Sequence, residues 1–254
     1  MTTASKIIIT ILSIVTVLVI FFAVIFRGIR GFIFNFSSNF KMVEESKELE
    51  GEVSEIIFDA SFTEASIVYG NELSVAYSMP EELVPTISFK NGTLTVKTGS
   101  NRLTNIPMNV TDDLYITITI PEGTELDKVS VDIDAGNLDI TDLKAGTVDL
   151  DMDAGNIDMK GVEADKISID CDAGNVDVKN CITDKFIIDL DAGNADLNNC
   201  EIDTIDAEVD AGNFDARNCT INGGSCKASL GNISLSGNIG DVKTDADLGN
   251  VEVH

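Results

Sequence analysis

Apolar and polar residues alternate with a period of two through the second half of the chain. Val129, Val131 and Ile133 alternate with serine and aspartate, and Leu138 and Ile140 resume the alternation after a short interruption. This pattern is typical of a half-buried β-strand, whose side chains point alternately to the two faces. The pattern returns every 19 residues, so the sequence predicts a stack of similar strands.

The tetrapeptide Asp-Ala-Gly-Asn interrupts the alternation in five successive repeats, and a reduced Leu-Gly-Asn follows in two more. Its glycine stands where a type II turn needs a positive φ, which a residue without a Cβ adopts freely. We therefore expect a tight turn at each copy. The seven predicted turn glycines are Gly136, Gly155, Gly174, Gly193, Gly212, Gly231 and Gly249.

Equivalent residues of successive repeats form columns, and the columns predicted to point inward contain no charged residue. A fixed period of this length, without the three-and-four spacing of a helix, indicates one structural unit stacked on itself. We predict an all-β fold, a single-stranded β-solenoid (β-helix) whose coils lie about 4.8 Å apart. The inward columns are Val131, Leu150, Ile169, Ile188, Ala207 and Cys226; Ile133, Met152, Cys171, Leu190, Val209 and Ala228; and Leu138, Ile157, Val176, Ala195, Phe214 and Ile233.

A strongly apolar segment precedes the β region. The 20 residues from Ile7 to Phe26 carry no charge, and a helix of that length crosses about 30 Å of hydrocarbon. The run is longer than that of a cleaved signal peptide and lacks its small-residue cleavage site, so we predict an uncleaved, single-pass transmembrane α-helix. Lys6 before it and Arg27 and Arg30 after it nearly balance the positive-inside rule.

These patterns divide the chain into five parts. Within the fourth part, Asn91-Gly92 separates two alternating runs and predicts a β-hairpin. Irregular strands are expected there because the terminal units of a solenoid differ from the internal ones. The predicted parts are an N-terminal tail (1–6), the transmembrane helix (7–26), a juxtamembrane segment and charged linker (27–53), irregular β coils that cap the N-terminal end (54–128) and the regular repeats (129–254).

The net charge of −26 is unevenly distributed. Residues 1–41 contain four basic residues and no acidic one, so the rest of the chain has 43 acidic and 13 basic residues. Without a basic patch the chain cannot release counterions from phosphates, and nucleic acid is excluded as a partner.

Each of the five cysteines occupies a position that is apolar in other repeats. We predict buried thiols that act as small apolar residues. A disulfide between neighbouring coils or a soft-metal site remains the alternative, although a linear column lacks the converging ligands that such a metal prefers. Cys171 and Cys226 lie in the inward columns, whereas Cys181, Cys200 and Cys219 share the position of Leu143 and Val162.

Three outward columns are almost wholly acidic, and we name each by its first residue. Like charges about 4.8 Å apart repel by about 3.5 kcal/mol at an effective dielectric constant near 20, before screening by salt. The three are the Asp132 ladder (Asp132, Asp151, Asp170, Asp189, Glu208), the Asp134 ladder (Asp134, Asp153, Asp172, Asp191, Asp210) and the Asp139 ladder (Asp139, Asp158, Asp177, Asp196, Asp215).

Two interpretations of the ladders remain open. In the first, the Asp134 ladder accepts backbone hydrogen bonds as Asx turns do, Asn137, Asn156 and Asn175 bond along the axis, and the other acids maintain solubility. In the second, adjacent coils bind Ca²⁺ or another hard divalent ion through oxygen ligands. The candidate cation ligands are Asp132, Asp151, Asp170, Asp189, Asp139, Asp158, Asp177 and Asp196.

The sequence indicates no catalytic residue and no cofactor. Paired carboxylates can hydrolyse glycosidic bonds, but every acid recurs in each repeat, so no pair is distinguished. The single histidine is His254, tryptophan is absent, and beyond Arg30 the only arginines are Arg102 and Arg217. We therefore expect a protein that is not an enzyme.

The chain resembles the DUF4097 putative-adhesin family of bacterial envelope proteins over about residues 50–254. The similarity rests on Phe58-Asp-Ala-Ser-Phe, Ala65-Ser-Ile-Val-Tyr, Asn91-Gly-Thr-Leu-Thr-Val and Ile116-Thr-Ile-Thr-Ile-Pro-Glu-Gly, followed by the iterated Asp-Ala-Gly-Asn coils. The family more often has Ser-Gly-Ser-Gly-Asp at this turn, so this chain keeps the glycine but has more acidic residues. The resemblance implies an anchored β-solenoid outside the cytoplasmic membrane, without catalytic residues to carry over.

We therefore expect a non-enzymatic, single-pass protein of the cell membrane whose acidic solenoid acts outside the cytoplasm as an adhesin or envelope scaffold. Its ligand, a protein or a glycan, is not named by the sequence. A Ca²⁺-binding repeat protein and a cytoplasm-facing assembly scaffold are the alternatives, and the basic residues Arg27 and Arg30 favour the latter. The strand edge expected at Val251-Glu-Val-His254 is either short and charged enough to be tolerated or used for end-to-end self-association.

Overall fold

The computed structural model describes residues 41–98 and 114–254. The predicted transmembrane helix, 7–26, lies outside these residues. Within them the secondary structure is β-strand apart from one short 3₁₀ helix, η1 (Glu81–Leu83). No helix in these ranges has the length and apolar character needed to cross a bilayer.

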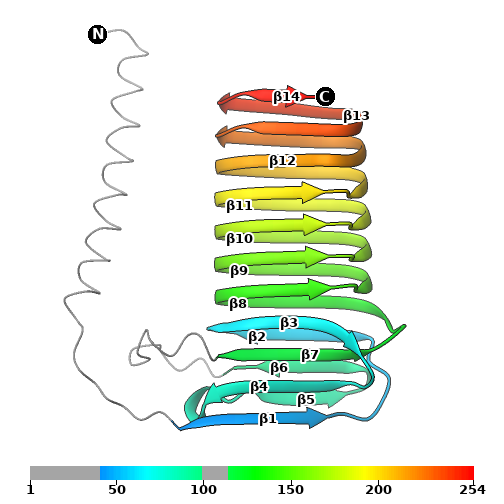
Figure 1. Ribbon diagram of the computed structural model, residues 1–254, viewed down its shortest axis with the longest axis vertical. Helices are drawn as coiled ribbons and strands as arrows, with labels where there is room; N and C mark the ends of the chain where they lie inside the picture. Colours follow the sequence, from blue (N-terminus) through cyan, green and yellow to red (C-terminus); the bar gives the residue numbers. More distant parts are fainter. Residues whose placement is uncertain (1–40, 99–113) are drawn as a thin grey trace, which may run out of the picture. The chain divides into compact units, whose positions relative to one another are not determined.

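The regular part is a β-solenoid of about seven turns, as predicted (Figure 1). Each strand pairs in parallel with the next, and in β8 to β12 equivalent repeat positions face one another, as Val131 does Leu150. The strands stack in chain order. They are β8 (Glu125–Thr141), β9 (Lys144–Lys160), β10 (Glu163–Lys179), β11 (Ile182–Asn198), β12 (Glu201–Leu230), β13 (Ile233–Leu248) and β14 (Val251–Val253).

The N-terminal strands form two branches that meet the solenoid at β8. Residues 128–133 of β8 pair with β2, which continues to β6 and β5, and residues 136–140 pair with β3, which continues to β7, β4 and β1. The outer pairs β1–β4, β4–β7 and β5–β6 are antiparallel. These strands are β1 (Met42–Glu48), β2 (Glu55–Ala60), β3 (Thr63–Gly70), β4 (Ser74–Pro80), β5 (Thr86–Lys90), β6 (Thr93–Lys97) and β7 (Tyr115–Pro121).

Two sequence predictions meet different outcomes in this region. The hairpin is confirmed: β5 and β6 are joined by Asn91 at φ 52° and Gly92 at φ 82°, the positive values that a tight two-residue turn requires. The end of the predicted linker 27–53 is wrong, because Met42–Glu48 is strand β1, paired with β4. Almost all of β1 is exposed, so it lacks the alternation by which a buried strand is recognised.

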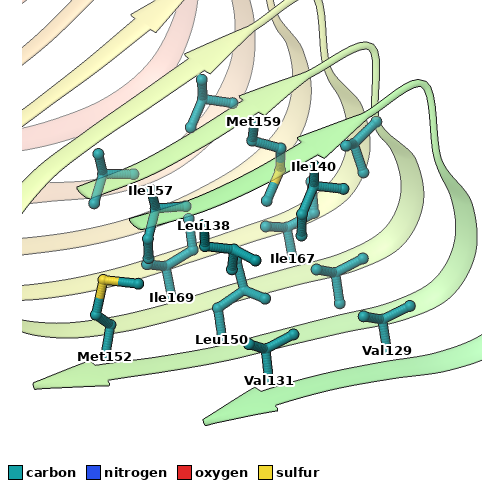
Figure 2. Close-up of a cluster of buried hydrophobic side chains, with 14 of the residues drawn as sticks. Val129, Val131, Leu138, Ile140, Leu150, Met152, Ile157, Met159, Ile167 and Ile169 are labelled. Carbon is teal, nitrogen blue, oxygen red and sulfur yellow. The ribbon is translucent and has the colours of Figure 1, made fainter. Parts of the chain in front are cut away.

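The predicted inward columns form the core. All three are buried, with no side chain more than 3% exposed. Figure 2 shows Val131 and Leu150 facing Leu138 and Ile157 across the interior of the coils. Because each apolar side chain also contacts its counterparts in the coils above and below, the core is continuous from β2 and β3 to β13.

The repeated glycine does not form the predicted type II turn. Asp-Ala-Gly-Asn lies inside the long strands β8 to β12, and Gly155 and Gly193 have φ values of 143° and 147°, far from the turn value near 80°. Glycine is required there because a Cβ on Gly155 would overlap the carbonyl group of Gly136, one coil earlier. The same overlap with the preceding coil holds for all seven predicted turn glycines.

The left-handed corner of each coil lies elsewhere, directly before the position of the stacked cysteines. Its residues have φ between 53° and 67°, a region that glycine, asparagine and aspartate tolerate. The sequence does contain this signal, as a column with a 19-residue spacing made only of these three residue types. The column is Asp142, Gly161, Asn180, Asn199 and Asn218.

Candidate functional site

Asparagine side chains form a continuous hydrogen-bonded column, the Asn ladder, along one face of the solenoid. Asn156 Nδ2 donates to Asn137 Oδ1 at 2.8 Å, and Asn175 Nδ2 donates to Asn156 Oδ1 at 3.2 Å, which confirms the predicted bonding along the axis. At the N-terminal end, Asn137 Nδ2 donates to both carboxylate oxygens of Glu64 at 2.8 and 2.9 Å. The Asn ladder consists of Asn137, Asn156, Asn175, Asn194, Asn213 and Asn232.

A groove of about 310 Å³ runs beside the Asn ladder. Its other wall is the Asp139 ladder, because each aspartate lies two residues after an asparagine and points to the same face of its strand. No basic residue lines this groove in the described chain. The lining residues are Glu64, Asn137, Asn156, Asn175, Asn194, Asp139, Asp158, Asp177 and Asp196.

The groove is polar and negatively charged. Partial desolvation by the surrounding atoms raises the pKa of Asp139 above its usual value although the side chain remains exposed, and the carboxylates of Asp158 and Glu64 raise it further. The Asp139 ladder becomes less exposed toward the C-terminal coils: Asp139 and Asp158 are exposed, whereas Asp177 and Asp196 are half-buried. A ligand in the groove would therefore meet carboxylates that already lose part of their hydration.

The Asp132 ladder is a separate acidic column. For Asp132, Asp151, Asp170 and Asp189, burial is the first cause that raises the pKa, and repulsion by neighbouring acids adds to it. The neighbours that act on Asp132 are Asp59 and members of the Asp132 and Asp134 ladders, and none belongs to the Asp139 ladder. The eight candidate cation ligands therefore lie in two columns and do not converge.

The described residues contain no group of three or more His, Cys, Asp or Glu side chains placed to hold a metal ion. A column of single carboxylates offers each ion few ligands, whereas Ca²⁺ takes six to eight oxygen atoms. The predicted backbone hydrogen bonds to the Asp134 ladder are also absent from the described ranges; the bond that Asp210 accepts comes from Ser229 Oγ at 3.0 Å.

The acidic ladders end on hydrogen-bond donors, which the sequence reasoning missed. Arg217 pairs with Asp196 at 3.0 Å and with Asp215 in the Asp139 ladder, and Lys227 lies 3.9 Å from Glu208 at the end of the Asp132 ladder. The sequence does contain a signal for these contacts, because three further donors lie one repeat, 19 residues, after the acids that they contact. These pairs are Asn222 with Asp203, Ser225 with Asp206, and Ser229 with Asp210.

The stacked cysteines behave as buried residues rather than as a reactive site. All five thiols are free and no more than 1% exposed. Within the column, the backbone N–H of Cys200 donates to Cys219 Sγ at 3.4 Å, and the Cys181 thiol donates to the Lys179 carbonyl at 3.4 Å. The hydrogen bond between Cys181 and Cys200 lowers the pKa of Cys181 and raises that of Cys200 to about 11. Outside the column, burial raises the pKa of Cys226 to about 12, which keeps that thiol protonated and unreactive at neutral pH.

Several solved structures are similar to this chain. No curated protein matches the chain. Among solved structures, a putative adhesin from Parabacteroides merdae has a TM-score of 0.50 and 17% identity, covering 85% of this chain and 97% of that one. A putative adhesin from Bacteroides fragilis has a TM-score of 0.47 and 16% identity, covering 84% and 97%. A putative cell adhesion protein from Clostridium sporogenes has a TM-score of 0.41 and 14% identity, covering 84% and 99%.

At these identities the structural likeness shows the fold alone. The sequence comparison reaches further, because a family model described as Toastrack DUF4097 matches residues 53–252. That range includes both N-terminal branches except strand β1, and nearly all of the solenoid. The chain therefore belongs to the Toastrack DUF4097 family, as its sequence resemblance predicted.

Proposed function

We propose that this protein is a non-enzymatic binding protein of the bacterial envelope, an adhesin that contacts its ligand through the groove beside the Asn ladder. One observation carries the proposal. The groove repeats the same amide and carboxylate in successive coils, so it presents an array of equivalent contacts about 4.8 Å apart. An array of this kind suits an extended ligand and gives no single position the distinct geometry that catalysis requires.

The charges of the groove indicate the chemistry of that ligand. Five carboxylates line it. Lys179 lies 3.3 Å from Asp177 and Arg217 lies 3.0 Å from Asp196, so three carboxylates have no basic partner within the described chain, and the groove accepts hydrogen bonds and repels polyanions. Asn156, Asn175 and Asn194 each use one N–H and the oxygen within the Asn ladder, and the described residues offer the second N–H no acceptor. A chain of neutral or amino sugars, which has hydroxyl and ammonium donors as well as acceptors, matches this pattern.

The solenoid supports an adhesive role mechanically as well. Its core is continuous along the stack of coils. Hydrogen bonds along the Asn ladder also restrict the orientation of each asparagine side chain. A preorganised array loses little conformational entropy on binding. The relatives described as a putative adhesin and a putative cell adhesion protein agree with this role, which stands for this chain as a proposal.

The first test measures binding of residues 40–254, which form one compact unit, to immobilised neutral, amino and anionic polysaccharides. We expect neutral or amino polysaccharides to bind, and the pair Asp158→Ala and Asp177→Ala to weaken binding about tenfold or more, because each removes a charged hydrogen-bond acceptor. The matched control is Asp151→Ala with Asp170→Ala, which removes acids of the same coils from the Asp132 ladder and should leave affinity unchanged.

Two results would reject this assignment. Preference for anionic polysaccharides would contradict the assignment, because the groove is negatively charged. Equal losses of affinity in the groove variant and the control variant would show that the groove does not bind the polysaccharide. A chelator is added in a parallel experiment: binding that disappears with the chelator and returns with Ca²⁺ would favour the calcium-binding alternative instead.

We also propose that the solenoid lies outside the cytoplasmic membrane, anchored by residues 7–26. The native thiols are buried, so they cannot report on location while the protein is folded. Glu201 is exposed on the solenoid, and a Glu201→Cys variant is expected to react with a membrane-impermeant maleimide on intact cells. Reaction only after lysis would place the solenoid in the cytoplasm and support the assembly-scaffold alternative.

A further inference from the structure

Three thiols stack directly on one another inside the solenoid. Cys181, Cys200 and Cys219 occupy the same position of successive coils, 19 residues apart, and each is 1% exposed. Their side chains have the same orientation, because each Sγ donates to the carbonyl oxygen two residues earlier in its own coil, at 3.4, 3.4 and 3.3 Å respectively. One orientation repeated from coil to coil places neighbouring sulfur atoms about one coil spacing, 4.8 Å, apart.

This spacing is too long for a disulfide. A disulfide needs Cβ atoms about 3.5–4.5 Å apart, whereas equivalent Cβ atoms of stacked coils repeat at about 4.8 Å. Backbone bonds on both sides hold the coils at this distance: the N–H of Glu201 donates to the Cys181 carbonyl at 2.9 Å, and that of Thr220 donates to the Cys200 carbonyl at 2.8 Å. A disulfide would have to pull the coils together against these bonds.

A metal ion in line between two neighbouring sulfur atoms does fit the spacing. A bond from a metal ion to a thiolate measures about 2.3 Å, so two such bonds in line span about 4.6 Å. Soft thiolates select Cu⁺, Zn²⁺ and iron–sulfur clusters. Zn²⁺ and the clusters need four converging ligands, and the described residues bring no such group together. Cu⁺ is the ion of this set that is stable with two sulfur ligands in line, the arrangement that a straight column offers.

The charge also balances in such a site. Cu⁺ would displace one proton to the solvent, bond to the resulting thiolate and accept a lone pair from the second thiol, which stays protonated. No electron is transferred, and the complex is neutral, so no net charge enters the apolar core. The hydrogen bond with Cys200 lowers the pKa of Cys181 and raises that of Cys219, which makes Cys181 the thiol that loses the proton and Cys200 the second ligand.

The corner of the coil gives access to this buried pair. Asn180 and Asn199, directly before the two cysteines, are exposed and have a left-handed backbone. Local opening of one corner uncovers the thiols without unfolding the stack, and metal ions also bind while a chain folds. Cu⁺ therefore reaches thiols that are closed to water in the folded coils.

We propose that one Cu⁺ binds in line between Cys181 Sγ and Cys200 Sγ and joins two adjacent coils inside the solenoid. The ion replaces the hydrogen bond between these two thiols and leaves the outer surface of the coils unchanged. The site is independent of the ligand of the groove, because the cysteine column lies in the core and the groove lies on the surface.

The test adds Cu⁺, as its acetonitrile complex, to the full chain in detergent micelles without oxygen, just below the melting temperature so that the corners open. After unbound metal is removed, we expect one copper ion per chain, and X-ray absorption at the copper edge should show two sulfur ligands and no others. Zn²⁺ added in the same way should not be retained. Bound copper should raise the melting temperature, because the two thiols are placed for it only in the folded chain.

Serine variants identify the ligands. Competition with a coloured copper(I) chelator should show that Cys181→Ser and Cys200→Ser each bind at least about tenfold more weakly, because a hydroxyl is a poor ligand for a soft ion. Cys219→Ser, a matched control in the same column, and Cys226→Ser, a buried thiol outside it, should bind normally. A loss caused by a buried hydroxyl alone would appear in Cys219→Ser as well.

Three results would overturn the proposal. The first is an unsubstituted chain that retains no copper. The second is a bound ion with three or more ligands, or with nitrogen or oxygen ligands. The third is a loss of affinity in Cys219→Ser or Cys226→Ser as large as that in Cys181→Ser, since the ion would then not lie between the two assigned thiols.

Discussion

Replacing Gly174 with alanine is expected to destabilise the solenoid by at least about 4 kcal/mol, an exceptional cost for a single methyl group. The new Cβ would overlap the carbonyl oxygen of Gly155 and lie 2.7 Å from its carbonyl carbon. Backbone atoms one coil away cannot move aside without breaking the in-register pairing of β9 with β10. Thermal unfolding of residues 40–254, followed by far-ultraviolet circular dichroism, measures the effect.

Gly223 provides the matched control for this substitution. It also lies in a long strand, β12, but its added Cβ would have a single near neighbour, the Asp241 carbonyl oxygen at 3.4 Å, which is an ordinary contact. Gly223→Ala should therefore change stability by no more than about 0.5 kcal/mol. Similar melting temperatures for the two variants would show that close backbone approach is not the reason for glycine in the repeat.

Mild acid is expected to stabilise the solenoid. Burial and neighbouring acids raise the folded-state pKa of five aspartates. A carboxyl group whose folded pKa exceeds its unfolded value, about 3.9, contributes stability below the unfolded pKa and loses it as the pH rises through the folded pKa. Lowering the pH from about 7.5 to about 4.5 should therefore raise the melting temperature. The five are Asp132, Asp139, Asp151, Asp170 and Asp189.

Neutral side chains of the same shape test the cause. Asp151→Asn with Asp170→Asn should raise the melting temperature at neutral pH and reduce the gain on acidification, because two of the responsible charges are gone. Asp184→Asn removes an exposed acid outside the three ladders and should change little. A melting temperature that is highest at pH 8 in low salt would contradict this account of the ladders.

The repeat made most of the fold predictable. Columns such as Val131, Leu150 and Ile169 recur at one spacing, so a strand that is ambiguous by itself gains support from its neighbours, and all the predicted core columns are buried. The acids and asparagines of the site were also assigned to their ladders correctly. What joins the Asn ladder and the Asp139 ladder into one groove is the shape of the surface, which a pattern of residue types does not encode.

The failures have a common physical origin. The role of Gly155 depends on a backbone atom of another coil, and a local turn propensity contains no information about that distance. Strand β1 is held by its pairing with β4, not by an apolar face of its own. The left-handed column at Asn180 and Asn199 was visible only when equivalent positions were compared, since one asparagine in a loop is unremarkable in a single coil.

The in-register pairing also gives the solenoid a unit of length. Every column of β9 recurs in β10 and again in β11, so each residue of β9 that now faces a residue of β10 would face the equivalent repeat position of β11. Excision of one whole period, residues 163–181, would join those two strands with each core column and ladder uninterrupted, and would shorten the stack by about 4.8 Å. The length of the solenoid can therefore change in steps of one whole coil, while the groove keeps the same cross-section.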